Sequence, residues 1–383
     1  MEDICISAVI PVFNAEQYIE KAIQSILNQA VHVQEIIVVD DGSTDRTCEI
    51  VENLQLTQPT VFFYKQENAG ASSARNNGIS TANSKWILLL DADDECTEDL
   101  IEHYKNKIQN DDYAAVYADF TQIDEGSNAI SGSFLGQELR GNKGFCQMLI
   151  RNPIISPSGS IIKKAAFEKV GGFDTNIKYG EDVDFWLRLL NLNFNVGHVP
   201  KPLIRIRRHA TNTTANIAIT KTGEKILLDK YSTTYIKEKI YSRDCSVEES
   251  HLDFANLLIR YDKWQEAYLL LQSIQIDKSN NRYISFLFIR TIVAIYFKNF
   301  QYAMRIYEEI LRNVSQHGAA LNNLGVLYAL NEDKVKAEQC IRKALTLYPG
   351  YIDATHNLSQ LGFSEPSYKF TMRELRNNLL RYS

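Results

Sequence analysis

Residues 35–45 read EIIVVDDGSTD, and this stretch decides the fold class. Its first half is an unbroken apolar run rich in β-branched side chains, which is typical of a strand buried on both faces. Its second half turns at Gly42 and offers Thr44 or Asp45 as the cap of a helix that runs to Leu54. A buried strand that passes through an acidic turn into a helix is the basic unit of a parallel α/β sheet.

The alternation of strand and helix continues on both sides of this unit. Apolar strand patterns cover residues 7–13, 61–64 and 85–90, and helical spacings cover residues 15–29 and 72–81. We therefore predict an α/β domain with a mainly parallel, doubly wound sheet. Ligands of such sheets bind beyond the carboxyl ends of the strands, which is where the acidic clusters of this chain fall.

Composition excludes several classes of protein. The net charge of −6 argues against nucleic-acid binding, which needs concentrated positive charge. The six cysteines form no CxxC pair, which favours reduced thiols over a zinc site or a disulfide framework. The acidic start is no signal peptide, and the longest apolar run, residues 284–297, is too short for a span of about 20 residues. We expect a cytoplasmic protein without a transmembrane segment, with peripheral binding at the inner membrane face as the alternative.

Two acidic motifs follow predicted strands. Asp91 and Asp93 come directly after the apolar run 87–90, and alternate carboxylates on an extended segment face the same side. With a diphosphate they suit a hard divalent cation, which prefers oxygen ligands. Asp41, in the first stretch, can accept hydrogen bonds from a uracil N–H or from ribose hydroxyls. Its ordinary alternative role is to cap the next helix.

Three further segments carry candidate ligands. Residues 67–76 are rich in Gly, Ala and Ser at a helix start, where backbone N–H groups suit an anion, and Arg75 lies one turn further in. Glu181 and Asp182 open an amphipathic helix, either as N-terminal acidic residues that stabilise it or as a general base. His209 ends a cationic strand and suits a diphosphate or a metal ion.

These motifs, in this order over about residues 6–213, resemble the family 2 glycosyltransferases with a GT-A fold. The resemblance implies an inverting, metal-dependent transfer from a nucleotide-diphosphate sugar, with a UDP-sugar as the expected donor, to a glycan, glycolipid or peptide. It implies that Asp182 is the catalytic base and that Asp93 and His209 hold Mn²⁺ or Mg²⁺. The expected nucleotide-sugar-binding residues are Pro11, Val12, Phe13, Asp41, Asn68, Arg75, Asp91, Ala92, Asp93, Glu181 and His209.

Two other functions compete with this one. A nucleotidyltransferase also pairs such a sheet with metal-binding aspartates, but it needs a Gly-rich, basic phosphate loop after the first strand, where this chain has Pro11 to Glu16. A scaffold built on the C-terminal half, with a vestigial transferase domain, is the second alternative, and the intact acidic motifs argue against it. Hydrolysis of UDP-sugars in the presence of Mn²⁺ separates the three.

After about residue 247 the pattern becomes purely helical, with few glycines and prolines. Ala267, Ala303 and Ala337 are spaced by 36 and 34 positions, near the tetratricopeptide period of about 34 residues. The repeats either hold an acceptor or a protein partner, or only pack and dimerise.

The expected organisation has four parts. The last of them either closes the repeat array or lies on a membrane surface, as basic amphipathic helices do. The parts are a GT-A domain over 1–215, a helical connector over 216–247, tetratricopeptide-like repeats over 248–365 and an amphipathic helix over 366–383.

Overall fold

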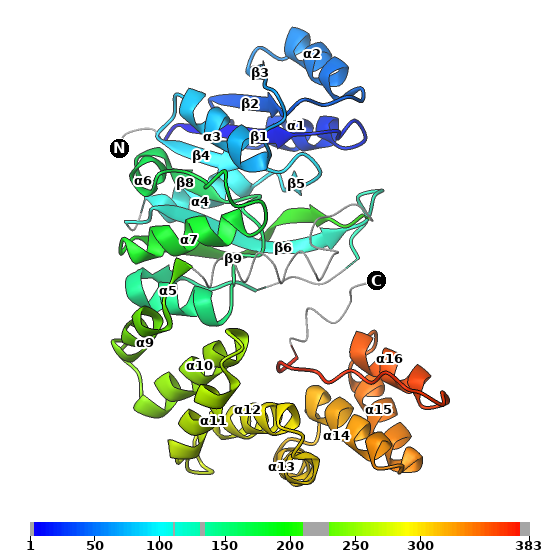
Figure 1. Ribbon diagram of the computed structural model, residues 1–383. Helices are drawn as coiled ribbons and strands as arrows, with labels where there is room; N and C mark the ends of the chain where they lie inside the picture. Colours follow the sequence, from blue (N-terminus) through cyan, green and yellow to red (C-terminus); the bar gives the residue numbers. More distant parts are fainter. Residues whose placement is uncertain (1–3, 110–111, 131–134, 210–229, 376–383) are drawn as a thin grey trace. The chain divides into compact units, whose positions relative to one another are not determined.

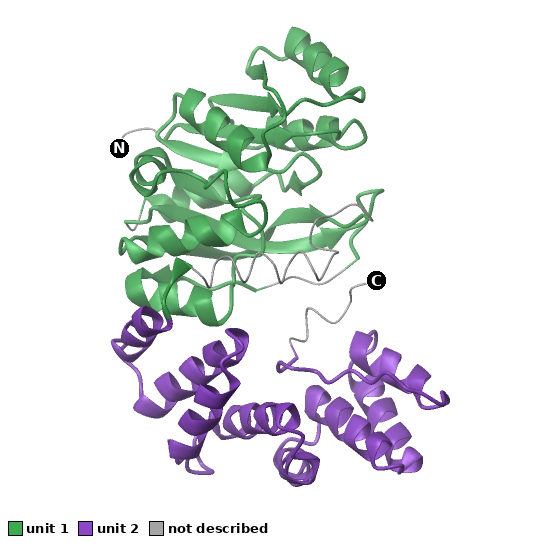
Figure 2. Cartoon of the chain, in the orientation of Figure 1, with its two compact units in different colours: residues 1–232 green, residues 233–383 purple. Residues whose placement is uncertain are grey.

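The chain folds as two compact units, residues 1–232 and 233–383 (Figure 2). No helix in the described parts of the chain is both long enough and apolar enough to cross a bilayer. The computed structural model describes residues 4–109, 112–130, 135–209 and 230–375.

The first unit is built on one sheet, which within the described residues has nine strands in the order β3-β2-β1-β4-β8-β6-β9-β5, with β7 beside β9 (Figure 1). The first four strands pair in parallel, and β1, β2 and β4 are buried along their whole length, as their apolar sequences predict. Their bounds are β1 Ile6–Val12, β2 Glu35–Asp40, β3 Val61–Lys65 and β4 Trp86–Leu89.

The second half of the sheet is mixed. Strand β8 is antiparallel to β4 and β6, whereas β6 and the long β9 are parallel. The predicted α/β fold is confirmed, and its parallel part is the half in which strand and helix alternate along the chain. The remaining strands are β5 Glu95–Cys96, β6 Ala115–Ile123, β7 Leu139–Arg140, β8 Ile161–Lys163 and β9 Asn195–Arg207.

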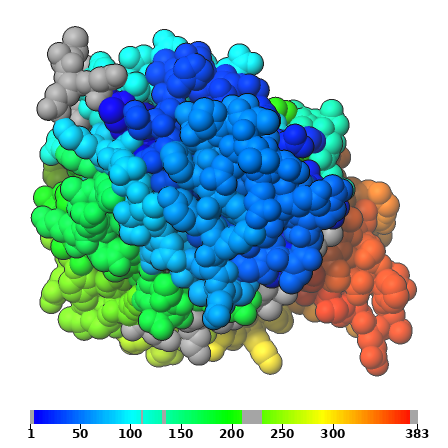
Figure 3. Space-filling model, turned by 90° about the horizontal axis from the view of Figure 1, so that it is seen from above, coloured from blue at the N-terminus to red at the C-terminus, as the bar shows by residue number. Residues whose placement is uncertain are grey.

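Helices of the first unit pack on this sheet. Helix α3 packs closely on β1 at Gly78. A Cβ atom at this position would lie 2.4 Å from Val9 Cγ1, so this approach requires a glycine. Seen from above, the segments up to about α3 form one continuous surface, coloured blue (Figure 3). The helices are α1 Ile19–Leu27, α2 Thr47–Thr57, α3 Ala71–Thr81, α4 Leu100–Ile108, α5 Gly141–Ile150, α6 Lys164–Val170 and α7 Glu181–Asn191.

The second unit is helical throughout its regular elements. Helix α9 packs on α10, so residues 233–247 belong to this unit and are not a separate connector; residues 216–229 of the predicted connector lie outside the described residues. The helices are α9 Thr233–Tyr241, α10 Val247–Arg260, α11 Trp264–Ser273, α12 Tyr283–Tyr296, α13 Phe300–Asn313, α14 Gly318–Leu330, α15 Lys334–Leu347 and α16 Ile352–Gln360.

A structural period matches the spacing of alanines in the sequence. Consecutive helices pair as α10 with α11, α12 with α13 and α14 with α15, and a fully buried alanine is the fourth residue of each second helix. Two residues before each second helix, the chain turns through a non-glycine residue in the left-handed region, which such residues rarely adopt. These turn residues are Asp262 (φ 55°), Lys298 (φ 57°) and Glu332 (φ 64°).

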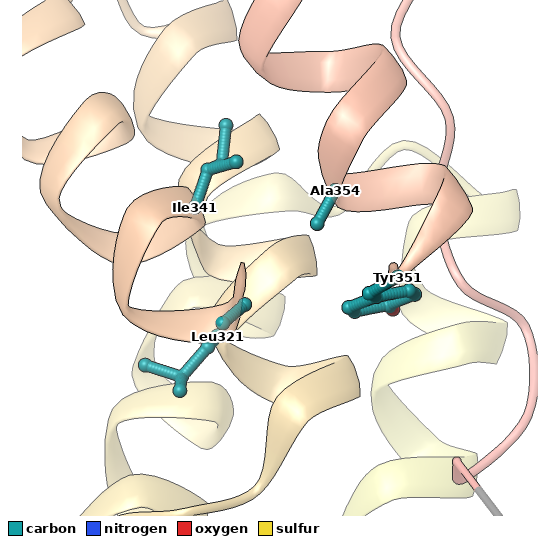
Figure 4. Packing of buried hydrophobic residues seen from close by; sticks show 5 residues of the cluster. Leu321, Ile341, Tyr351 and Ala354 are labelled. Carbon is teal, nitrogen blue, oxygen red and sulfur yellow. The ribbon is translucent and has the colours of Figure 1, made fainter. Parts of the chain in front are cut away.

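The pairs are held together by apolar contacts between neighbours. Leu321 of α14, Ile341 of α15, Ala354 of α16 and Tyr351, which directly precedes α16, belong to one buried cluster (Figure 4). Since no helix pair can bury its apolar face alone, stacking supplies the core of this unit.

The predicted amphipathic helix over residues 366–383 is wrong for residues 366–375, the part that the structure describes. This segment has no helical turn, and Thr371 is buried while Lys369 and Met372 are exposed. The physical reason is that side-chain amides on α14 and α16 pair with its main chain, which a helix would commit to its own hydrogen bonds.

Candidate active site

The candidate site lies at the carboxyl ends of β1, β2 and β4. The backbone N–H of Asp41 donates to the carbonyl of Val12 at 2.8 Å, which joins the ends of β1 and β2. Pro11 and Val12 are buried in β1, whereas the side chain of Phe13 is 50% exposed at the strand end. Phe13 therefore presents an apolar ring beside the acidic turn.

Asp41 organises the loop that precedes α3. Its buried carboxylate accepts the backbone N–H groups of Ala69 and Gly70, both at 2.8 Å, and the side-chain amide of Gln66 at 2.7 Å. Asn68 donates to the Asp41 carbonyl at 2.9 Å. A carboxylate has about four acceptor positions, and contacts within the described part of the chain use three of those of Asp41.

Arg75 joins two parts of the site that are far apart in the sequence. Its buried guanidinium contacts Asp91, just after β4, at 2.8 Å and Glu181, the first residue of α7, at 2.9 Å. Burial lowers the pKa of Arg75, but Asp91 and Glu181 outweigh burial and raise the pKa above its usual value. The start of α7 is thereby fixed against the acidic loop.

Asp93 and His209 form the second contact of the site. Asp93 Oδ2 lies 2.9 Å from His209 Nε2, and Tyr18 stacks on the imidazole with 5.4 Å between ring centroids. Burial, and then the charge of Asp91, raise the pKa of the Asp93 carboxyl, while the bond to His209 lowers it. Ala92, between the two aspartates, is buried.

Arg207 shapes the acidic loop, a role that the sequence analysis missed. Its side chain is fully buried; it donates to the Asp93 carbonyl at 2.8 Å and contacts the Glu95 carboxylate. Its backbone N–H donates to Asp94 Oδ1 at 2.9 Å. The sequence signal for this role was the alternation of side chains along β9, which puts Arg205 and Arg207 on the same face of the strand. Both arginines contact Glu95.

Asp182 is the second residue of α7, which follows Gly180 at a φ of 83°. Burial, and then the neighbouring charge of Glu181, raise the pKa of the Asp182 carboxyl to about 7. A carboxyl with such a pKa is a candidate for proton transfer near neutral pH, because it is then available as a base of useful strength.

Asp184, two residues later, has a structural role. It is fully buried between Arg188 and Lys230, both at 2.8 Å. Arg188 also donates to the carbonyls of Val170 and Gly172, and these bonds hold the glycine-containing turn that ends α6. The three acidic residues at the start of this helix therefore differ in their contacts. Glu181 pairs with Arg75 and Asp184 supports the helix, whereas Asp182 has no such ion pair among the described contacts.

The predicted residues meet in three contacts, which are Asp41 with Asn68, Arg75 with Asp91 and Glu181, and Asp93 with His209. Within the described ranges, no group of three or more His, Cys, Asp or Glu side chains is arranged to hold a metal ion.

We expect Arg75→Lys to lower the free energy of unfolding of the first unit by about 1–3 kcal/mol, because an ammonium pairs with one carboxylate and leaves the other buried without its partner. Thermal unfolding followed by circular dichroism measures the loss. Arg46→Lys is the matched control, since Arg46 pairs with Glu49 at the surface and its replacement should leave the midpoint unchanged. Equal midpoints for Arg75→Lys and wild type would contradict the bridging role.

Comparison with known proteins identifies a family with a similar sequence. Residues 7–171 match the family model described as glycosyl transferase family 2. An uncharacterized glycosyltransferase of Rickettsia typhi is 33% identical over 225 residues, which cover 57% of this chain and 68% of the relative. The glycosyltransferase GlyG of Streptococcus pneumoniae is 31% identical over 176 residues, covering 43% of this chain and 58% of the relative.

Other similarities are partial or concern the fold alone. A relative from Rickettsia bellii, also an uncharacterized glycosyltransferase, is 29% identical over 218 residues, and the chain spans only 30% of its length. Among solved structures, S. aureus TarS residues 1–349 in complex with UDP-GlcNAc has a TM-score of 0.52 at 15% identity, covering 90% of this chain and 91% of that one.

Proposed function

The chain belongs to glycosyltransferase family 2, and from that membership we propose that it transfers a sugar from a UDP-sugar to an acceptor with inversion at the anomeric carbon. The acceptor class is a glycan, a glycolipid or a peptide. The observation that carries the proposal is the Arg75 bridge, which fixes the carboxyl-bearing start of α7 against the acidic loop after β4.

The donor would bind across the ends of β1, β2 and β4. The exposed ring of Phe13 can pack on a planar base, and the fourth acceptor position of Asp41 suits the uracil N–H. Asp91 follows β4, the strand that pairs with β1, and Ser156 Oγ lies 3.4 Å from its Oδ2; we assign Asp91 to accept a hydrogen bond from the ribose hydroxyls. TarS was solved with UDP-GlcNAc, and we propose the same donor class, a UDP-sugar, for this chain.

Asp182 is the proposed catalytic base. A carboxylate at the start of α7 can take the proton of the acceptor hydroxyl as its oxygen attacks the anomeric carbon. The bond from that carbon to the UDP oxygen breaks in the same step, so the configuration inverts. Burial makes the Asp182 carboxylate a stronger base than an ordinary aspartate.

Asp93 and His209 fit a divalent cation, Mn²⁺ or Mg²⁺. Asp93 Oδ2 and His209 Nε2 are hydrogen-bonded at 2.9 Å, and a carboxylate oxygen and an imidazole nitrogen that has lost its proton could both bind such an ion. When bound, such a cation neutralises the charge that develops on the departing diphosphate. Arg207 and Arg75 both contact the loop that carries Asp93 and hold it in place.

The pH dependence of turnover tests the role of Asp182. The sign follows from the raised pKa: the carboxyl is protonated and inactive as a base below about pH 7 and is ionised above it. We expect kcat for UDP release, screened over several UDP-sugars with Mn²⁺, to rise tenfold per pH unit below about 7 and to level off above. A rate independent of pH from 5 to 8 would contradict the assignment.

We also propose that α10–α15 are tetratricopeptide-like repeats that hold the acceptor or a protein partner. The period of buried alanines and left-handed turns supports this. Residues 1–232 alone should fold and release UDP from a UDP-sugar, but should modify the true acceptor poorly, because the donor contacts lie in the first unit. Mass spectrometry of the acceptor measures its modification, and a UDP-release assay measures donor turnover; both are compared between the full chain and residues 1–232. Equal acceptor modification by both would show that the helices do not recruit substrate.

A further inference from the structure

Two buried asparagines hold the main chain of the segment after α16. Asn357 of α16 accepts the N–H of Lys369 and donates to its carbonyl, both at 2.7 Å. Asn323 of α14 does the same to Thr371, accepting its N–H at 2.7 Å and donating to its carbonyl at 2.8 Å. Each side-chain amide thus replaces the edge of a neighbouring β-strand, since residues i and i+2 of an extended chain present their polar groups on one side.

The two amides occupy equivalent positions in successive repeats. Asn323 is the sixth residue of α14 and Asn357 the sixth residue of α16, 34 positions later. The corresponding residue of α12 is the apolar Phe288. The paired amides therefore form a short ladder on one face of the helical unit, along which the segment runs back from α16 past α14 (Figure 1).

A third feature of this face recognises one hydroxyl group. Thr371 Oγ1 donates to Asp353 Oδ2 at 2.8 Å, accepts from Asn322 Nδ2 at 3.1 Å and contacts the Tyr351 hydroxyl. Thr371 is 7% exposed, and Asn322 is fully buried. Because buried polar groups cost free energy when they lose their partners, this face is built to have an occupant with a hydroxyl here.

Within residues 367–372, the side chains of Ser367, Lys369 and Met372 are exposed. Beyond these residues, Glu374 reaches Ser285 Oγ of α12 at 3.2 Å and His317 Nε2 at 3.7 Å, and Leu375 packs against the buried cluster of the helical unit. Hydrogen bonds to the main chain do not depend on which side chains a bound segment carries. The affinity of this face for a segment therefore comes from the extended backbone, and its selectivity comes from a single hydroxyl group. Other extended segments with Thr or Ser at that position satisfy the same groups.

We propose that the α14–α16 face is a binding site for an extended polypeptide with Thr or Ser at its central position, and that residues 367–372 occupy it as an internal competitor. The partner is a protein segment that displaces these residues and takes over both amide pairs and the hydroxyl pocket. The site is available to that partner only when the chain's own segment leaves it.

The test keeps the full chain. A recognition site for a specific protease replaces the exposed residues 362–365, so that cleavage leaves the segment bound without a covalent link. The probe is a fluorescent peptide of residues 366–375, followed by anisotropy. We expect the cleaved protein to bind the probe at least about tenfold more tightly than the uncleaved protein, since loss of the tether removes the local excess of competitor.

Peptide variants assign the contacts without any risk to folding. Thr371→Val in the probe should weaken binding by about tenfold or more, because three polar groups, those of the buried Asn322 and Tyr351 and the partly buried Asp353, lose this partner. N-methylation at Thr371, which removes the N–H that Asn323 accepts, should weaken it similarly. Lys369→Ala, which changes an exposed side chain, and N-methylation at Phe370 are the matched controls and should change affinity by less than about threefold.

Three outcomes would overturn the proposal. The first is unchanged anisotropy of the probe after cleavage, which would mean that the segment does not exchange. The second is loss of the cooperative thermal transition of the helical unit on cleavage, which would make the segment a part of the core. The third is equal affinity for the probe, its Thr371→Val variant and a scrambled peptide, which would show that binding is non-specific.

Discussion

Asp182→Asn is expected to lower kcat by about 10²–10⁴-fold, the usual contribution of a positioned general base, while the affinity for UDP stays unchanged. The amide keeps the size and polarity of the carboxyl but cannot take the proton of the acceptor. It also carries no charge next to Glu181, so the variant should fold as well as the wild type. Initial rates at saturating donor and acceptor, with UDP binding measured by calorimetry, give both quantities.

The pH profile and a surface control sharpen this result. The residual activity of Asp182→Asn should no longer rise with pH up to about 7, because the titrating carboxyl group has been removed. Glu168→Gln, an exposed acid on α6, should keep wild-type kcat. If Asp182→Asn instead lost UDP affinity at unchanged kcat, Glu181 would become the better candidate for the base.

Asp93→Ala is expected to lower turnover by at least about 10²-fold, because the cation that we propose to bind there would supply several kcal/mol of stabilisation to the leaving diphosphate. The remaining rate should no longer respond to Mn²⁺ or to EDTA. His209 would keep its stacking on Tyr18, so the loss would belong to the carboxylate rather than to a collapsed loop.

A matched control and a binding measurement complete this experiment. Glu98→Ala removes an exposed carboxylate a few residues along the same segment and should leave turnover and its dependence on Mn²⁺ unchanged. Binding of Mn²⁺ in the presence of UDP, measured by calorimetry, should weaken for Asp93→Ala alone. Wild-type turnover of Asp93→Ala in EDTA would show that no cation acts at this position.

The fold of the first unit follows from sequence up to β4, because apolar strands and amphipathic helices alternate there. The later strands could not be ordered in this way: β6 and β9 pair across a long insertion, and their partner β8 is only three residues long. Sequence periodicity contains no information on such distant pairings.

The candidate site divides in the same manner. Asp41, Asp91 and Asp93 were predictable because each follows a recognisable strand, whereas the role of Arg207 depends on which loops surround it after folding. The segment over 366–375 was misjudged because its apolar residues repeat at a helical spacing. The contrary signal lay elsewhere, in the buried Asn322 and Asn323 on an otherwise apolar helix.

The Arg75 bridge has a consequence for how this chain can diverge. One guanidinium joins Glu181 to Asp91, so the distance between the start of α7, which carries the proposed base, and the loop after β4 does not depend on the length of the chain that connects them. The loops of that connecting chain, outside β6 and α5, can therefore vary in length without disturbing the contact between Asp91, Arg75 and Glu181. Variation in acceptor preference among descendants of this sequence should accumulate there first, as changes in length rather than in catalytic residues.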